Sequence, residues 1–214
     1  MPQKTFLNLS EDRKKEILNI CFEEFAVYDY ESASLSRIID ALGLAKGSFY
    51  RYFENKKDLY LYLADYAGKS VYSNFSNYFN RPEKGFFENW LDFFMSFAEL
   101  EKTYPMIIRF RIKTASEKSS EVYKGDDKET GNDKTAFIRE ILDKYQDGGE
   151  IRKEIDTDFV ALYILSFDYI ICDFITRKYG LKKNSPVFNV PGIDLRESVA
   201  GFINIARDGL QKLS

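Results

Sequence analysis

The sequence contains no histidine, only two cysteines and no apolar run at its N-terminus. Without histidine, the chain lacks the commonest general base and half of the ligand types in Cys/His metal clusters. Cys21 and Cys172 each lie alone in an apolar stretch, which predicts two reduced core thiols and no secreted disulfide framework. Residues 1–10 show no signal peptide pattern. We therefore expect a cytoplasmic protein that uses neither a metal nor another cofactor.

Long uninterrupted apolar segments are also missing. The most apolar stretch, residues 159–175, is short for a membrane span and is interrupted by Asp168 and Asp173. It predicts a buried helix of a soluble bundle and no membrane partner. The chain carries 31 basic and 34 acidic residues, so net charge does not indicate a nucleic-acid partner. Residues 34–57 differ, because five basic and two acidic residues give them a local excess of positive charge.

Apolar residues recur at helical spacing along the whole chain, and we find no segment with the alternating pattern of a strand. Ser10 and Ser34 are the expected N-caps of the first two helices, and Gly43 suits the end of the second. The sequence therefore predicts an all-α protein with about nine helices. They are expected at Ser10–Asp29, Ser34–Leu42, about Ala45–Tyr52, from Asn55 or Lys56 to about Tyr78, Glu83–Glu101, from Tyr104 onward, Lys134–Tyr145, Thr157–Tyr179 and Asp194–Leu213.

Residues 34–53, SLSRIIDALGLAKGSFYRYF, read as two short helices joined by a tight glycine turn. This spacing is typical of a helix-turn-helix, whose second helix enters the major groove of DNA. Lys46 supplies charge, Gly47 permits close backbone approach, and Phe49 with Phe53 is the expected core-facing pair. Hydroxyl groups for bases or phosphates come from Ser48, Tyr50 and Tyr52, while Lys56 begins the next helix, where a phosphate can bind.

The segment GLAKGSFYRYFENKKDL resembles the signature of the TetR family of transcriptional regulators, and the resemblance covers about residues 13–60. It implies a homodimer that binds a palindromic operator in double-stranded DNA and usually represses nearby genes. It also implies a variable C-terminal domain, in which an unknown small-molecule effector causes release from DNA. By position, the resemblance assigns DNA binding to Ser34, Ser36, Arg37, Lys46, Gly47, Ser48, Tyr50, Tyr52 and Lys56.

The helical pattern together with the resemblance predicts two domains with no flexible linker between them. Residues 1–56 form a three-helix DNA-binding domain and residues 57–214 a helical ligand-sensing and dimerisation domain, with the boundary inside the long helix at about 56–66. Three positions depart from the family pattern: Asp29 replaces the glycine that ends the first helix, Ala45 replaces a capping serine, and Ile39 replaces a small residue. Asp tolerates the left-handed conformation, whereas Ala45 leaves the recognition helix without a side-chain cap.

Aromatic residues of the C-terminal part are candidates for a pocket that binds a small apolar or aromatic ligand. Simple core packing explains the same pattern, and both interpretations stay open. Asp168 either pairs with Arg109 or Arg111, or selects a cationic ligand. The candidate ligand-binding residues are Trp90, Phe94, Phe97, Met106, Phe110, Phe137, Ile141, Tyr163, Phe167 and Asp168.

The last two expected helices carry long apolar faces that suit a two-fold symmetric four-helix interface. The predicted dimer contacts are Val160, Ile164, Ile171, Phe174, Val199, Phe202, Ile203, Ala206 and Leu210, with Phe167 on the same face. Two other classes of function remain as alternatives. One is an all-helical enzyme that uses carboxylates such as Glu83, Glu88 or Asp92, and the other is a helical adaptor that binds proteins through aromatic residues.

Overall fold

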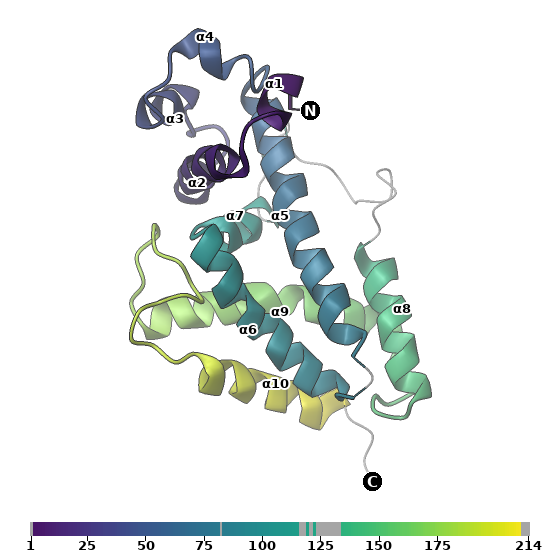
Figure 1. Cartoon of the computed structure of the whole chain (residues 1–214). Coiled ribbons are helices and arrows are strands. Elements are labelled where there is room, and N and C mark those ends of the chain that lie inside the picture. Colours follow the sequence, from purple (N-terminus) through teal and green to yellow (C-terminus); the bar gives the residue numbers. More distant parts are fainter. Residues whose placement is uncertain (1, 82, 116–118, 120–121, 123–133, 211–214) are drawn as a thin grey trace. The chain divides into compact units, whose positions relative to one another are not determined.

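Every regular element that the structure describes is a helix. The computed structural model describes residues 2–81, 83–115, 119, 122 and 134–210, except for the side chains of Tyr72, Ala115 and residues 134–137. Within these ranges no strand occurs, which confirms the prediction of an all-α protein. The helices (Figure 1) are α1 (Lys4–Leu7), α2 (Glu11–Val27), α3 (Leu35–Ala41), α4 (Lys46–Phe49), α5 (Lys56–Phe79), α6 (Phe86–Thr103), α7 (Ile107–Ala115), α8 (Lys134–Asp147), α9 (Thr157–Lys178) and α10 (Arg196–Leu210).

One described helix was not predicted, and others differ at their ends. The short helix α1 has no apolar periodicity and no side-chain cap, and only Phe6 is buried in it. Such a helix forms because tertiary packing holds it, which a local pattern does not reveal. Helix α4 ends at Phe49 rather than at Tyr52. The predicted end of the last helix at Leu213 lies outside the described residues.

The predicted caps at the start of α2 and α3 are confirmed. The hydroxyl oxygens of Ser10 and Ser34 accept hydrogen bonds from the backbone N–H groups of Arg13 and Arg37. Gly43 has a φ of 60°, a left-handed conformation that glycine adopts without steric cost. These local signals explain why the first helical elements begin and end where the sequence places them.

The end of α2 is stabilised differently from the prediction. Asp29 does not adopt the left-handed conformation, since the only described residues with positive φ are glycines. Instead, the Lys113 ammonium group on α7 donates a hydrogen bond to the Val27 carbonyl at 3.0 Å and pairs with the Asp29 carboxylate at 3.0 Å. A lysine from a distant helix therefore satisfies a free carbonyl that a C-terminal glycine motif would otherwise satisfy.

The chain divides into two compact units, and neither is continuous in sequence. The N-terminal unit comprises Met1–Ser73, Phe97–Tyr123 and Leu181–Pro191, and the C-terminal unit comprises Asn74–Ser96, Lys124–Gly180 and Gly192–Ser214. Helices α5 and α6 therefore each contribute residues to both units. The predicted functional boundary near residues 56–66 concerns the DNA-binding domain, and it stays a prediction.

Helix α9 is the most apolar element of the C-terminal unit. By length and composition alone it could cross a membrane, with 39% of its most apolar window buried inside the chain. Its Phe167 packs against Trp90 of α6, with ring centroids 4.8 Å apart, and α8 and α10 both contact α9. Trp90 is completely buried, as are Ile171 of α9 and Val199 of α10. One side of α9 thus forms the core of this unit.

A buried carboxylate anchors the segment Leu181–Pro191, which we call the strap, within the N-terminal unit. Glu101 of α6 is completely buried and accepts hydrogen bonds from the backbone N–H groups of Val187, Phe188 and Asn189 at 2.7–3.0 Å. Arg109 of α7 also donates a hydrogen bond to the Ser185 carbonyl. Because an irregular segment has few internal partners for its backbone, these bonds hold the strap in place.

We predict that Glu101 makes stability depend on pH. Burial raises the pKa of Glu101 from 4.5 to about 7, although the three backbone N–H groups and Arg109 act in the opposite direction. The folded chain therefore holds a proton that the unfolded chain releases at lower pH, so the free energy of unfolding contributed by this group falls between about pH 5 and pH 7.5. By linkage the decrease is at most about 3 kcal/mol.

Denaturant unfolding at several pH values measures this contribution. In Glu101→Gln the decrease between pH 5 and 7.5 is expected to be smaller than in the wild type, because the titrating group is gone. The exposed Glu99, which pairs with Lys102 at 2.6 Å on the same helix, provides the control variant Glu99→Gln. Equal pH profiles for the wild type and Glu101→Gln would contradict the prediction.

Candidate functional site

Helices α3 and α4 form the helix-turn-helix within the N-terminal unit (Figure 1). On α3, Ile38 and Ile39 are buried, so the departure at position 39 is accommodated in the core. Phe49 of α4 and Phe53 after it are both completely buried, with ring centroids 6.0 Å apart. This confirms their prediction as the core-facing pair, and it fixes which side of α4 faces outward.

Helix α4 and the turn after it carry the polar residues predicted to meet DNA. Lys46, Gly47 and Tyr50 are exposed, while Ser48 and Tyr52 are half-buried. The N-cap residue Ala45 makes no side-chain hydrogen bond, as predicted. The backbone N–H groups at the start of this helix therefore have no side-chain acceptor from the cap position.

Two of the three residues predicted to bind DNA at the start of α3 contact other residues of the chain. The Arg37 guanidinium donates hydrogen bonds to the buried Glu24 carboxylate, at 2.5–3.2 Å, and lies 4.1 Å above the Tyr28 ring. Glu24 also accepts a hydrogen bond from the Ser34 backbone N–H at 2.7 Å. Arg37 and Ser34 thus attach α3 to α2. Ser36 is exposed on α3, so its hydroxyl group is accessible to a DNA phosphate or base.

Lys56 also has an internal role that the sequence did not indicate. Its ammonium group donates hydrogen bonds to the carbonyls of Tyr30, Glu31 and Ala33 at 2.7, 3.2 and 3.2 Å. It lies 4.5 Å from the centroid of the Tyr30 ring. Its three ammonium donors are thus directed at the turn between α2 and α3. The neighbouring Lys57 is exposed at the same helix start.

The candidate ligand-binding residues fall into both compact units. Trp90, Phe94, Ile141, Tyr163, Phe167 and Asp168 belong to the C-terminal unit, whereas Phe97, Met106 and Phe110 belong to the N-terminal unit. Phe137 lies in the C-terminal unit too, but its side chain lies outside the described residues. Except for Tyr163, which is half-buried, and Phe137, all of them are buried. The structure therefore separates the predicted set into two groups.

The predicted dimer contacts require a correction. Seven of the nine are buried inside the chain, because the apolar face chosen from the sequence is the one that packs in the core: Val160, Ile164, Ile171, Val199, Ile203, Ala206 and Leu210. A partner chain cannot use side chains that are already enclosed. Phe174 is 37% exposed and Phe202 half-buried, so these two remain accessible.

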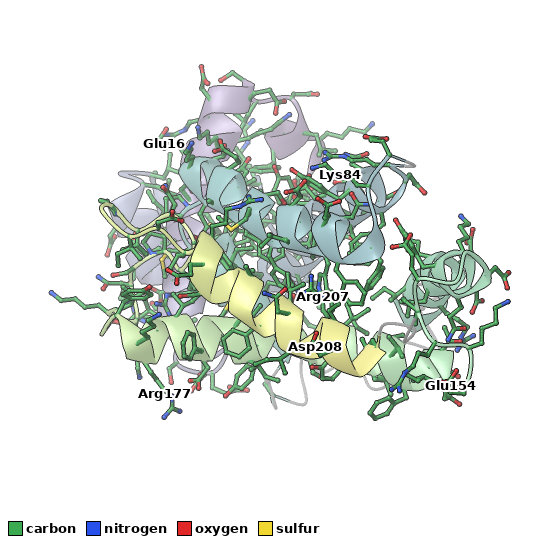
Figure 2. All side chains as sticks on the ribbon, turned by 90° about the horizontal axis from the view of Figure 1, so that it is seen from below. Glu16, Lys84, Glu154, Arg177, Arg207 and Asp208 are labelled. Atoms are coloured by element: carbon green, nitrogen blue, oxygen red, sulfur yellow. The ribbon has the colours of Figure 1, made fainter. Side chains whose placement is uncertain are left out.

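The opposite side of α9 and α10 exposes large apolar side chains that the sequence reasoning missed. They are Phe159, Leu162, Tyr169, Ile170 and Phe174 on α9 and Ile205 on α10, between 37% and 71% exposed. A surface hollow of about 510 Å³ lies among Tyr169, Ile170, Asp173, Phe174, Arg177, Lys178 and Phe202. Arg177 projects away from α9 in Figure 2 and pairs with Asp173 at 2.8 Å. We call this side the outer face of α9 and α10.

The carboxylates considered for an enzyme do not form a shared site. Glu83 and Glu88 are exposed. Asp92 is bonded to Lys84, with Arg81 at 3.7 Å and Arg196 at 3.8 Å. Asp92 is thus engaged in ion pairs with basic side chains of its own unit. Among the described residues, no group of three or more His, Cys, Asp or Glu side chains could hold a metal ion.

Comparison with known proteins identifies a family for the segment that contains the helix-turn-helix. Residues 17–63 match the family model of bacterial regulatory proteins of the tetR family. This range includes α3, α4 and the start of α5, and so all of the helix-turn-helix. No curated protein matches the sequence.

Solved structures share the whole fold. A TetR family transcriptional regulator from Chloroflexus aurantiacus superposes with a TM-score of 0.73 at 22% identity, over 100% of both chains. A gamma-butyrolactone receptor described as ArpA-like has a TM-score of 0.60 at 17% identity, over 92% of this chain and 97% of its own.

A third structure is the ketosteroid transcriptional regulator of Mycobacterium tuberculosis, with a TM-score of 0.61 at 15% identity, over 96% of this chain and 98% of its own. At these identities the likeness establishes the fold. The family model adds the identity of the helix-turn-helix segment. Residues 17–63 therefore carry the DNA-binding domain of bacterial regulatory proteins of the tetR family, and the whole chain has the fold of TetR family transcriptional regulators.

Proposed function

We propose that the protein is a homodimeric repressor that binds a palindromic operator through α4 and releases it when a small apolar ligand binds. It acts in the bacterial cytoplasm, where the DNA lies, and has no catalytic role. The observation that carries the proposal is the outward side of α4. Lys46, Gly47 and Tyr50 are exposed, although Phe49 between them is completely buried. With Phe49 in the core, this segment presents its polar residues to a DNA groove.

Gly47 supports this interpretation in particular. A Cβ atom placed there would meet no atom of the chain within 4 Å, and Gly47 does not have a positive φ. The fold itself therefore gives no reason for glycine at this position. Close approach of a DNA backbone to α4 gives one, because a side chain would then separate the two surfaces.

Lysine and tyrosine variants of α4 test DNA binding. Lys46→Ala is expected to lower the slope of log affinity against log salt concentration by about one, since one phosphate contact is lost. Tyr50→Phe removes only a hydroxyl group and is expected to weaken binding by about three- to tenfold. Fluorescence anisotropy measures both, on a duplex selected by the wild-type protein from a random pool.

The exposed Lys69, which pairs with Asp65 on α5, provides a matched lysine control. Lys69→Ala should leave both affinity and salt slope unchanged. If Lys46→Ala and Tyr50→Phe also bound as the wild type does, α4 would not be the DNA-reading helix. Expression of a reporter gene behind the selected duplex separates repression from activation, and we expect it to fall.

The outer face of α9 and α10 is the proposed dimer interface, in place of the buried face. Its exposed apolar side chains, including Leu162, Ile170 and Ile205, lie on the two helices that the sequence analysis assigned to dimerisation. Several large apolar side chains exposed on neighbouring helices are typical of a protein interface. A two-fold dimer would hold two copies of α4 about 34–36 Å apart, one turn of DNA.

Introducing a charge on the outer face should prevent dimerisation. Ile170 is 43% exposed, and Ile170→Asp is expected to convert the dimer into a monomer, because an aspartate buried there would be unpaired. Light scattering at micromolar concentration measures the mass. Leu7, which is 51% exposed on α1, provides the control Leu7→Asp, which should remain dimeric. A dimeric Ile170→Asp variant would show that the interface lies elsewhere.

The ligand site is proposed around Trp90 in the C-terminal unit. The Trp90 ring lies beside Phe167 at 4.8 Å and Phe94 at 6.3 Å, and its indole nitrogen is buried without a hydrogen-bond partner in the described part of the chain. An apolar ligand with an acceptor atom would satisfy this donor. Two structural relatives are described as a gamma-butyrolactone receptor and a ketosteroid regulator, which makes lactones and steroids the first compounds to test.

Trp90 also provides the measurement, because it is the only tryptophan. Titration with lactones and steroids is expected to produce a saturable change in its fluorescence, together with release of bound DNA. Trp90→Phe keeps the aromatic packing but removes the N–H donor, so it should weaken DNA release by about threefold or more. If Trp90→Phe released DNA at the same ligand concentration as the wild type does, the ligand site would lie elsewhere.

A further inference from the structure

The recognition helix is too short to hold its own tyrosines in place. Helix α4 has four residues, Ala45 gives it no side-chain cap, and Tyr50–Tyr52 follow as a turn. Isolated helices of this length are unstable, because few hydrogen bonds offset the loss of backbone entropy. The position of Tyr52 must therefore be set by contacts from other parts of the chain.

One such contact comes from the N-terminal residues before α2. The backbone N–H of Gln3 donates a hydrogen bond to the Tyr52 carbonyl at 2.9 Å. This bond joins two segments that are remote in sequence, directly beside the residue predicted to meet DNA. It restrains the backbone of Tyr52 itself.

A second contact is made by the side chain of Phe6 on α1. Phe6 is completely buried, and its ring centroid lies 4.9 Å from that of Phe53, 5.6 Å from Tyr62 and 6.1 Å from Tyr52. The ring therefore packs on the turn after α4 and on the first part of α5 together. It places the turn relative to the long helix that follows it.

The rest of α1 shows that this packing is the reason the helix forms. Gln3, Lys4 and Leu7 are exposed, and the N-cap residue makes no side-chain hydrogen bond. Burial of Phe6 is the only substantial apolar contribution from these residues. A segment whose single buried side chain contacts the recognition turn is suited to positioning that turn.

We propose that residues 3–7 are a positioning element for the recognition helix, acting on Tyr52 through the Gln3 N–H group and the Phe6 ring. This inference rests on the proposed function, in which α4 and the turn after it contact DNA. When these contacts are weakened, helices α2 to α5 still fold, but Tyr52 samples more positions. Sequence-specific binding then weakens, whereas phosphate attraction, which depends on charge, is retained.

A proline substitution removes one of the two contacts and little else. Gln3 has a φ of −71°, which proline adopts, and its side chain is exposed, but proline has no N–H group to donate. Gln3→Pro therefore deletes the bond to Tyr52 and leaves the Gln3 carbonyl bonds of α1 possible. Gln3→Ala keeps the N–H group and is the matched control.

The variants are compared on the duplex selected by the wild-type protein and on a scrambled duplex of equal composition. Gln3→Pro is expected to bind the selected duplex about three- to tenfold more weakly, and the scrambled duplex within twofold, with an unchanged salt slope. Gln3→Ala should match the wild type on both. Amide hydrogen exchange of residues 50–53 in the free protein should be faster in Gln3→Pro only, while the melting temperatures agree.

A graded variant covers the case in which Gln3→Pro disturbs folding. Phe6→Leu keeps an apolar side chain but loses the ring contacts. Its ratio of affinities for the selected and the scrambled duplex is expected to fall below that of the wild type, but by less than in Gln3→Pro. If Gln3→Pro and Phe6→Leu both match the wild type in selectivity and amide exchange, the positioning role is wrong while the proposed function stands. If the wild-type protein itself selects no sequence, the proposed function fails, and this inference with it.

Discussion

Two lysine ammonium groups hold the carbonyls around the end of α2, and the arrangement of the helix-turn-helix depends on them. Lys56 binds the carbonyls of Tyr30, Glu31 and Ala33, and Lys113 binds that of Val27. Tyr30 and Ala33 are almost completely buried, so carbonyls in this turn would lose water without gaining a partner if the lysines were absent. The turn sets the direction in which the chain enters α3.

The same turn connects the helix-turn-helix to helices far along the chain. Lys56 opens α5, and Lys113 lies near the end of α7. Glu24 of α2 binds both the Arg37 side chain and the Ser34 backbone at the start of α3. A displacement of α5 or α7 would therefore strain these bonds, and this gives the proposed ligand response a physical route within the N-terminal unit. Coupling of this kind typically amounts to about 1–3 kcal/mol.

The proposed dimer depends on how α9 divides its apolar side chains. The helix is apolar on nearly every side, and eight of its residues are buried in the chain. The side chains on the outer face remain exposed and, as we propose, are covered by a second copy. An apolar pattern predicts that a side chain is shielded from water. It does not predict whether the core of the same chain or a partner chain shields it. For this reason the dimer contacts chosen from the sequence were largely core residues.

The sequence by itself determined the helical class, the caps at Ser10 and Ser34, the glycine turn at Gly43 and the outward side of α4. These features follow from short-range spacing, since capping bonds join residues three apart and a helical face repeats every 3.6 residues. Helix α1, the carbonyl contacts of Lys56 and Lys113, the strap held by Glu101 and the division of α9 were decided only by the tertiary structure. In each of these cases the partners lie far apart in the sequence, so no local pattern specifies which groups meet.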